Sequence, residues 1–158
     1  MVEIEKSQEV NASIDFVWKL VSDLDNEHKS WSFLKDVKQL RKTENSIERE
    51  AKVRRGPMGE AKSLQTLTIH PSKKSTELSL TKGPMLGARK IALSDLGDGR
   101  TKIDLSWKFE MKGVPGFEVG FVKDNVSEVT EKSLKAIAQE AEKISHHVAQ
   151  RNGPPVPH

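Results

Sequence analysis

Residues 116–150 read GFEVGFVKDNVSEVTEKSLKAIAQEAEKISHHVAQ and form the longest stretch of the chain with one hydrophobic period. Apolar residues recur mostly in steps of three and four, at Phe121, Val122, Val126, Val129, Ile137, Ala141, Ile144 and Val148. This spacing predicts one long amphipathic helix. The half from Phe117 to Val129 is bulky, whereas the half from Ile137 to Val148 carries alanine. We therefore expect the second half to approach its packing partner more closely.

The region before this helix has short apolar runs separated by turn residues, a pattern typical of an antiparallel meander. Its clearest alternation places Ile103, Leu105, Trp107, Phe109 and Met111 on one face and charged or polar residues on the other. One face of the sheet is therefore expected to meet a core and the other to meet water. The six predicted strands are Leu34–Lys42, Ser46–Arg55, Ala61–His70, Ser75–Lys82, Ala88–Leu96 and Thr101–Met111.

The N-terminal residues predict a seventh strand and two short helices. Alternation over Val2–Val10 favours a half-buried strand. Ser13 stands at the N-cap position of a helical apolar pattern that reaches Leu24, and Asp23–Trp31 is expected to form a second short helix or turn. Strands in sequence followed by one long helix indicate an α+β fold with a single domain over residues 1–151 and a mobile tail over 152–158.

Composition excludes several classes of function. The chain has no cysteine, which removes disulfides, thiolate metal sites and a cysteine nucleophile. The 26 basic and 23 acidic residues are mixed along the chain, so the net charge of +3 does not indicate nucleic acid as a partner. No stretch has the length of a transmembrane segment and the N-terminus lacks a secretory pattern, so we expect a soluble, cytoplasmic protein.

The polar residues do not form a recognisable catalytic or metal-binding pattern. The five histidines lack the spacing of metal ligands, because neighbours such as His146 and His147 point in different directions on a helix. No serine lies in a nucleophile elbow, and no glycine-rich loop is placed to hold phosphate. We therefore predict no catalytic residue, no metal and no cofactor, and the sequence leaves the oligomeric state open.

The order of elements resembles that of the START or Bet v 1-like superfamily, also called helix-grip, SRPBCC or polyketide cyclase/dehydrase-like. The resemblance covers nearly the whole chain, and its most specific part is the segment FVWKLVSD at residues 16–23 followed by Trp31. It implies a curved sheet of about seven strands wrapped around the long C-terminal helix, with a cavity between them. Members include lipid and hormone binders, aromatase/cyclases and protein-interaction domains, so the fold alone does not choose the activity.

If that cavity exists, ten residues are candidates for its lining. They are Arg49, Val53, Leu67, Leu80, Trp107 and Phe109 on strands, and Phe117, Phe121, Val122 and Asn125 on the helix. The alternative is that the apolar members fill a solid core, because periodicity does not distinguish a filled interior from a hollow one.

Three glycine-proline loops are candidates for the cavity mouth. They are Gly56–Gly59, Gly83–Gly87 and Gly113–Gly116, and Met58, Met85 and Leu86 supply apolar side chains at their tips. The alternative is that glycine and proline simply make the turns.

Arg49 and Arg55 share a strand face with Ile47, Ala51 and Val53, so either arginine is a candidate for contacting an acidic ligand group inside the sheet. The competing interpretation is a bulge or sheet edge that directs both arginines to solvent.

The leading hypothesis for function is the binding or transport of a hydrophobic small molecule such as a lipid, an isoprenoid or a polycyclic aromatic. The first alternative is a cyclase or dehydratase that acts in the same cavity. The second is a protein-interaction module that uses the outer sheet or the long helix.

Overall fold

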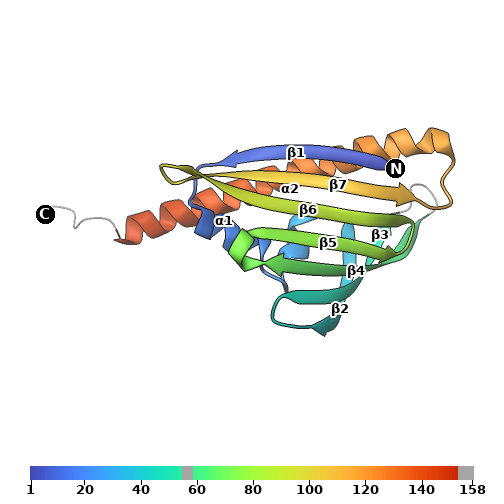
Figure 1. Ribbon diagram of the computed structural model, residues 1–158, viewed down its shortest axis with the longest axis horizontal. Helices are drawn as coiled ribbons and strands as arrows, with labels where there is room; N and C mark the ends of the chain where they lie inside the picture. Colours follow the sequence, from blue (N-terminus) through green and yellow to red (C-terminus); the bar gives the residue numbers. More distant parts are fainter. Residues whose placement is uncertain (55–58, 153–158) are drawn as a thin grey trace, which may run out of the picture.

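The structure, a computed structural model, describes residues 1–54 and 59–152, and it is a curved antiparallel sheet with one long helix on one face (Figure 1). The seven strands lie in the order β1-β7-β6-β5-β4-β3-β2, so consecutive strands of the meander are neighbours and β1 joins the edge beyond β7. The strands are β1 (Val2–Val10), β2 (Leu34–Lys42), β3 (Ser46–Arg54), β4 (Glu60–His70), β5 (Ser75–Lys82), β6 (Met85–Gly97) and β7 (Arg100–Met111). The predicted α+β meander is confirmed.

Over Asp23–Trp31, where a second short helix or turn is expected, the structure has a 3-10 helix, and the segment directly after β1 forms one short α-helix. This α1 (Ile14–Val21) is followed by the 3-10 helix η1 (Glu27–Ser30), and a further 3-10 turn, η3 (Pro71–Lys73), joins β4 to β5. Ser13 stands at the N-cap as predicted, but its side chain makes no capping hydrogen bond. The backbone carbonyl of Ser13 instead accepts from the N–H groups of Phe16 and Val17.

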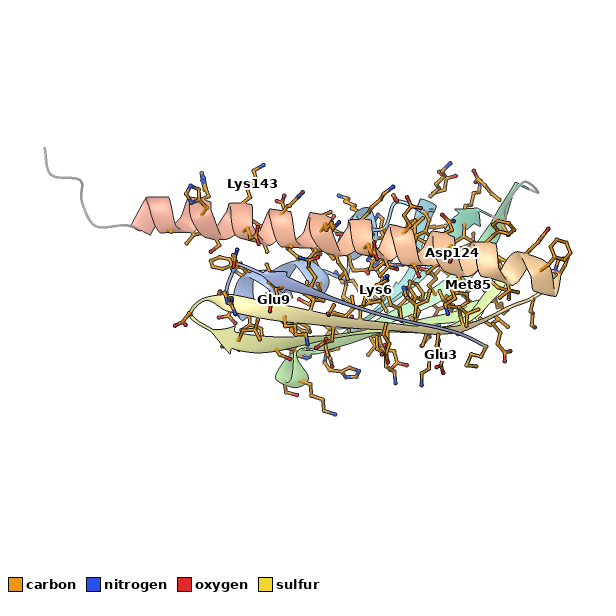
Figure 2. All side chains as sticks on the ribbon, turned by 90° about the horizontal axis from the view of Figure 1, so that it is seen from above. Glu3, Lys6, Glu9, Met85, Asp124 and Lys143 are labelled. Carbon is orange, nitrogen blue, oxygen red and sulfur yellow. The ribbon has the colours of Figure 1, made fainter. Side chains whose placement is uncertain are left out.

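The long helix α2 (Gly116–Asn152) packs along one face of the sheet, and side chains fill the space between helix and sheet (Figure 2). Ion pairing and hydrogen bonding fasten it to the β1 edge, where Lys6 Nζ lies 2.6 Å from Glu131 Oε1 and the Asn11 N–H donates to Glu142 at 3.0 Å. Figure 1 shows the C-terminal end of α2 projecting beyond the sheet.

The two halves of α2 pack differently, as the sequence predicts. Its buried side chains are Thr130, Ser133, Leu134, Ile137, Ala138 and Ala141, and residues 116–129 contribute none. In that first half, Phe117 and Phe121 are 77% and 75% exposed. The bulky half is therefore the more loosely packed one, because its largest side chains point to water.

The β5–β6 hairpin turns more tightly than predicted, since only Gly83 and Pro84 separate the two strands. Gly83 has a φ of +127°, and a Cβ there would lie 2.9 Å from the Lys62 carbonyl oxygen. The Lys112 N–H donates to the Pro84 carbonyl at 2.8 Å. This hydrogen bond places the loop that begins at Gly83 beside the loop that begins at Gly113. Met85 and Leu86 therefore belong to β6, where they are half-buried, and are not loop-tip residues.

Gly87 on β6 allows a close approach between strands that a side chain would block. Its φ is +154°, and a Cβ added there would lie 2.0 Å from the Lys108 carbonyl oxygen and 2.6 Å from the Phe109 Cα. Backbone atoms of β7 cannot move aside as a flexible side chain does. We expect Gly87→Ala to lower the free energy of unfolding by more than about 2 kcal/mol.

Urea denaturation measures this loss, with Gly99→Ala as the control. Gly99 also has a positive φ, +70°, but a Cβ there meets nothing within 4 Å. Equal losses in the two variants would show that φ alone, and not the close approach to β7, makes glycine necessary at position 87.

Candidate ligand-binding site

The structure brings five of the ten predicted lining residues together on the inner face of the sheet. Arg49, Leu67, Leu80, Trp107 and Phe109 are all buried. Val53 and Val122 are half-buried, whereas Asn125, Phe117 and Phe121 are exposed. Five of the six strand residues among them are therefore buried on the inner face, whereas Phe117 and Phe121 line no interior space in this arrangement.

Arg49 points inward and is fully buried, so the bulge or edge interpretation is wrong for this residue. The irregularities in this part of the sheet lie on β2, between Lys35 and Lys38 and between Gln39 and Arg41, and the β3–β4 register is continuous. Arg49 thus keeps the inward face that it shares with Ile47 and Ala51. Arg55 and the mouth candidate Met58 lie outside the described residues.

A buried ionic cluster surrounds Arg49. Arg49 Nη1 donates to Glu27 Oε2 at 2.9 Å, and Arg89 Nη2 donates to the other oxygen, Glu27 Oε1. The exposed fractions of the three residues are 3% for Glu27 and 0% for each arginine. One carboxylate from η1 therefore bridges two guanidinium groups from β3 and β6.

Amide and hydroxyl groups continue this cluster along β4. Arg49 Nε donates to Gln65 Oε1 at 3.0 Å, and Gln65 Nε2 donates to Ser63 Oγ at 3.3 Å. Gln65 and Ser63 are themselves buried. The sheet therefore carries a polar stripe across a largely apolar inner face, and the contact with Gln65 fixes the position of the Arg49 side chain.

Aromatic rings form the other wall of the cluster. The Arg89 guanidinium lies 4.2 Å from the Trp31 ring centroid and 5.7 Å from that of Trp107, distances typical of cation–π contacts. Trp107 also packs edge-on against Trp31 and Phe109, with centroids 6.1 Å apart in each case. Trp107 Nε1 donates to Thr130 Oγ1 at 3.0 Å, which connects this wall to α2.

The two arginines keep Glu27 ionised. Burial acts to raise the pKa of Glu27, but the charges of Arg89 and Arg49 and their hydrogen bonds outweigh it, so the pKa lies below its ordinary value. Partial burial and the charge of Arg49 lower the pKa of the neighbouring His28. Because both of its oxygens accept hydrogen bonds from guanidinium groups, the Glu27 carboxylate stays negatively charged and acts as the counterion of the two arginines.

Stability is expected to depend on pH through Glu27. A carboxyl group with a lowered pKa in the folded state stabilises the fold above its ordinary pKa, and this contribution is lost as the pH falls through the folded-state value. The free energy of unfolding should therefore fall steeply below about pH 4. Urea denaturation from pH 7 to pH 3 measures the effect.

His28 provides the control for this pH series. The pKa of His28 is lowered in the folded state, so protonation of His28 destabilises the fold below about pH 6.5. This range lies above the one in which Glu27 is protonated. A His28→Gln variant should lose only that upper part of the pH dependence. An unchanged loss of stability below pH 4 in Glu27→Gln would show that other carboxyl groups cause it.

Several donors in the cluster have no acceptor among the described residues. These are Arg49 Nη2, Arg89 Nε and Nη1, and Trp31 Nε1. Thr76 Oγ1 on β5 is buried and without a partner as well. Arg89 therefore has two buried nitrogens without an acceptor, and its guanidinium group lies beside the Trp31 and Trp107 rings.

The sequence held a signal for Arg89 but none for Glu27. Arg89 alternates with Ile91 and Leu93, both buried, so the period of two placed it on the inner face. Glu27 lies in a polar segment without hydrophobic periodicity. It is buried because η1, which contains it, packs against the inner face of the sheet. Burial of an acidic residue depends here on partners 22 and 62 residues away, which no local pattern reveals.

Two hollows lie away from this cluster. One, of about 420 Å³, is lined by Glu5, Lys6, Ser7, Lys90, Ala92, Asp104, Leu105 and Ser106. The other, of about 300 Å³, lies beside the two glycine-proline loops and is lined by Ala61, Lys62, Gly83, Pro84, Lys112 and Gly113. Neither includes a predicted lining residue, and the buried cluster is closed in this arrangement.

Two further classes of site are absent from the part of the chain that the structure describes. No group of three histidine, aspartate or glutamate side chains there is placed to hold a metal ion. No helix over residues 1–54 and 59–152 is long and apolar enough to span a membrane.

Solved structures share this fold at low sequence identity. A protein from Thermus thermophilus matches with a TM-score of 0.77 and 14% identity, covering 91% of this chain and 99% of that one. The Zhui aromatase/cyclase from a Streptomyces species matches with a TM-score of 0.62 and 14% identity over 97% and 96% of the two chains. A START superfamily protein from Mycobacterium smegmatis matches with a TM-score of 0.63 and 17% identity over 92% and 98%.

The sequence itself provides the family assignment. No curated protein matches the chain significantly. The model of the family described as polyketide cyclase / dehydrase and lipid transport matches residues 1–142. Together with the helix-grip arrangement of sheet and α2, this match shows that the chain belongs to the polyketide cyclase/dehydrase and lipid transport family.

Proposed function

We propose that this chain binds or transports a hydrophobic small molecule, such as a lipid, an isoprenoid or a polycyclic aromatic, between the inner face of the sheet and α2. The observation that carries the proposal is the inner face itself, where Trp107, Phe109, Leu67 and Leu80 surround a buried polar cluster. An apolar wall with a few fixed polar groups is the usual composition of a small-molecule site. Burial of the ligand supplies affinity, and the polar groups set its orientation.

Entry of a ligand requires a movement, and the first half of α2 is the element best suited to it. Residues 116–129 bury no side chain, and Val119, Val122 and Val126 are only partly buried against the core. Segments with few buried contacts open at lower free energy than the rest of a fold. Displacement of this half would uncover the apolar inner face while the second half of α2 stays packed.

Glu27 favours binding over proton transfer as the role of the interior. An acid that donates a proton near neutral pH has a raised pKa and a free oxygen. The pKa of Glu27 is lowered, and each of its oxygens accepts from an arginine. The cyclase or dehydratase alternative therefore needs another proton donor.

Calorimetric titration with the neutral apolar probe phenylnaphthylamine tests the proposal. We expect binding of one molecule per chain. Val122→Trp should weaken binding about tenfold, because the added ring fills space on the inner side of the first half of α2. Lys123→Trp is the matched control, since Lys123 is the exposed neighbour on the same helix.

The two variants also determine where the probe lies. Equal affinity in Val122→Trp and Lys123→Trp would place the probe outside the interior and contradict the proposal. The absence of any bound probe, together with the absence of apolar compounds in a solvent extract of the purified protein, would contradict it as well.

A further inference from the structure

We propose that the interior ligand is an amphipathic organic acid, whose anionic group is held by Arg89, Arg49 and Trp31. This inference rests on the proposed function and specifies the chemical class of ligand for the same site. Two independent features of the cluster support it, namely its net charge and its set of unpaired donors.

The first feature is the charge of the cluster. Arg49 and Arg89 each carry one positive charge, and Glu27 is the one acid that contacts them among the described residues. The group therefore holds a net charge of +1 in a region where each of the three side chains is at most 3% exposed. Buried charges in proteins are normally paired, because an unpaired charge loses its hydration. One added negative charge would neutralise the cluster.

The second feature is the unpaired donors. Arg49 Nη2, Arg89 Nε and Nη1, and Trp31 Nε1 are buried nitrogens without an acceptor among the described residues. Native proteins leave few such groups unsatisfied, and a missing ion or ligand is one of the established reasons. All four nitrogens only donate, so the partner has to supply acceptor atoms alone. A carboxylate or a sulfonate meets this requirement, whereas an alcohol supplies a single oxygen.

The surroundings of these donors indicate what the rest of the ligand is. The Arg89 guanidinium lies over the Trp31 ring and near that of Trp107, and the register places Arg89 opposite Trp107 and Gly87 opposite Phe109. An anion bound to the unpaired nitrogens of Arg89 would therefore lie next to aromatic rings. A molecule with an acidic end and an apolar body satisfies both parts of this environment, whereas a small inorganic anion satisfies only one.

A pair of probes with one skeleton tests the inference. Anilinonaphthalene sulfonate and phenylnaphthylamine share their aromatic rings and differ by the sulfonate group. Calorimetry should show the wild-type protein binding the sulfonate at least about tenfold more tightly, because hydrogen bonds from buried charged donors are strong. Binding of both probes with equal affinity would overturn the inference and leave the proposed function standing. Binding of neither would contradict the proposed function itself.

Charge variants locate the anionic group. Arg89→Gln lowers the charge of the cluster by one unit, so it should remove most of the preference for the sulfonate over phenylnaphthylamine. Lys90→Gln is the matched control, because it removes one positive charge from the exposed neighbour on β6. A preference lost equally in both variants would assign the sulfonate to the outer face and overturn the inference.

Two further measurements keep the test decisive. If Arg89→Gln does not fold, the wild-type comparison of the two probes still supports or overturns the inference. Sodium sulfate, compared with sodium chloride at equal ionic strength, tests for a free anion as the occupant. Sulfate that raises the thermal midpoint while the two organic probes bind equally would show a site for inorganic anions and overturn the assignment of an amphipathic acid.

Discussion

Glu27→Gln lowers the free energy of unfolding by about 3–5 kcal/mol, which is the loss expected when one partner of a buried ion pair is removed. The carboxylate is 3% exposed and bridges two arginines that are fully buried. The amide keeps the shape of the side chain but leaves two guanidinium charges without a counterion. Neither arginine can neutralise itself by losing its proton. Urea denaturation at pH 7 measures this loss.

A surface variant and a double variant serve as controls for Glu27→Gln. Glu128→Gln breaks an exposed pair with Lys132 on α2, where the two side chains are 65% and 74% exposed, and should change stability by less than about 0.5 kcal/mol. The double variant Glu27→Gln with Arg89→Gln returns the cluster to a net charge of +1. It should be more stable than Glu27→Gln alone. The reverse order would refute the charge argument.

Trp107→Ala produces the second large effect, a loss of about 3–5 kcal/mol. The indole is 1% exposed and packs against Trp31 and Phe109, and it also lies beside Arg89. Its Nε1 donates to Thr130, so the side chain joins the sheet to the middle of α2. Truncation creates a cavity at the junction of these elements and leaves a buried hydroxyl without its donor.

Trp107→Phe separates packing from hydrogen bonding. It keeps an aromatic ring but removes the donor to Thr130, and we expect a loss of about 1–3 kcal/mol from the unpaired hydroxyl and the smaller ring. Trp18→Ala is the comparison in α1, where the ring is only partly buried, and its loss should be smaller than that of Trp107→Ala. Chemical denaturation followed by circular dichroism orders the three variants. Equal losses of stability in Trp18→Ala and Trp107→Ala would show that burial in the inner wall does not make Trp107 more important for stability than a partly buried tryptophan.

The sheet could be predicted because its signals are local. Alternation along β7 alone places Ile103, Leu105, Trp107 and Phe109 inward, and all four are buried. Residues that turn the chain, such as Gly97 and Gly99, bound the strands in sequence and in the structure. The β6 strand begins earlier than predicted because glycine at 87 is tolerated inside a strand where the neighbouring backbone comes close.

The first half of α2 shows where periodicity is insufficient. Large apolar side chains on a helix suggest burial, but Phe117 and Phe121 lie at its start and point to water. The side of a helix that is buried depends on the curvature of the sheet below, and the sequence of the helix does not contain that information. The buried arginines show a different limit. Alternation along β3 and β6 places Arg49 and Arg89 on the inner face, but it does not reveal that Glu27, from a distant segment, is the counterion that makes their burial possible.

The indole N–H signals of the three tryptophans test the binding of a ligand inside the sheet most directly. Trp31 and Trp107 lie in the inner wall, whereas Trp18 lies in α1 with Lys74 over its ring at 5.3 Å. In a proton–nitrogen correlation spectrum, with signals assigned from single Trp→Phe variants, addition of phenylnaphthylamine should shift the Trp31 and Trp107 signals and leave Trp18 nearly unchanged. An interior binding site would be contradicted if saturating probe left the Trp31 and Trp107 indole signals unmoved. The same holds if it shifted only the amide signals of Lys90 and Asp104, which line the hollow of about 420 Å³ away from the cluster.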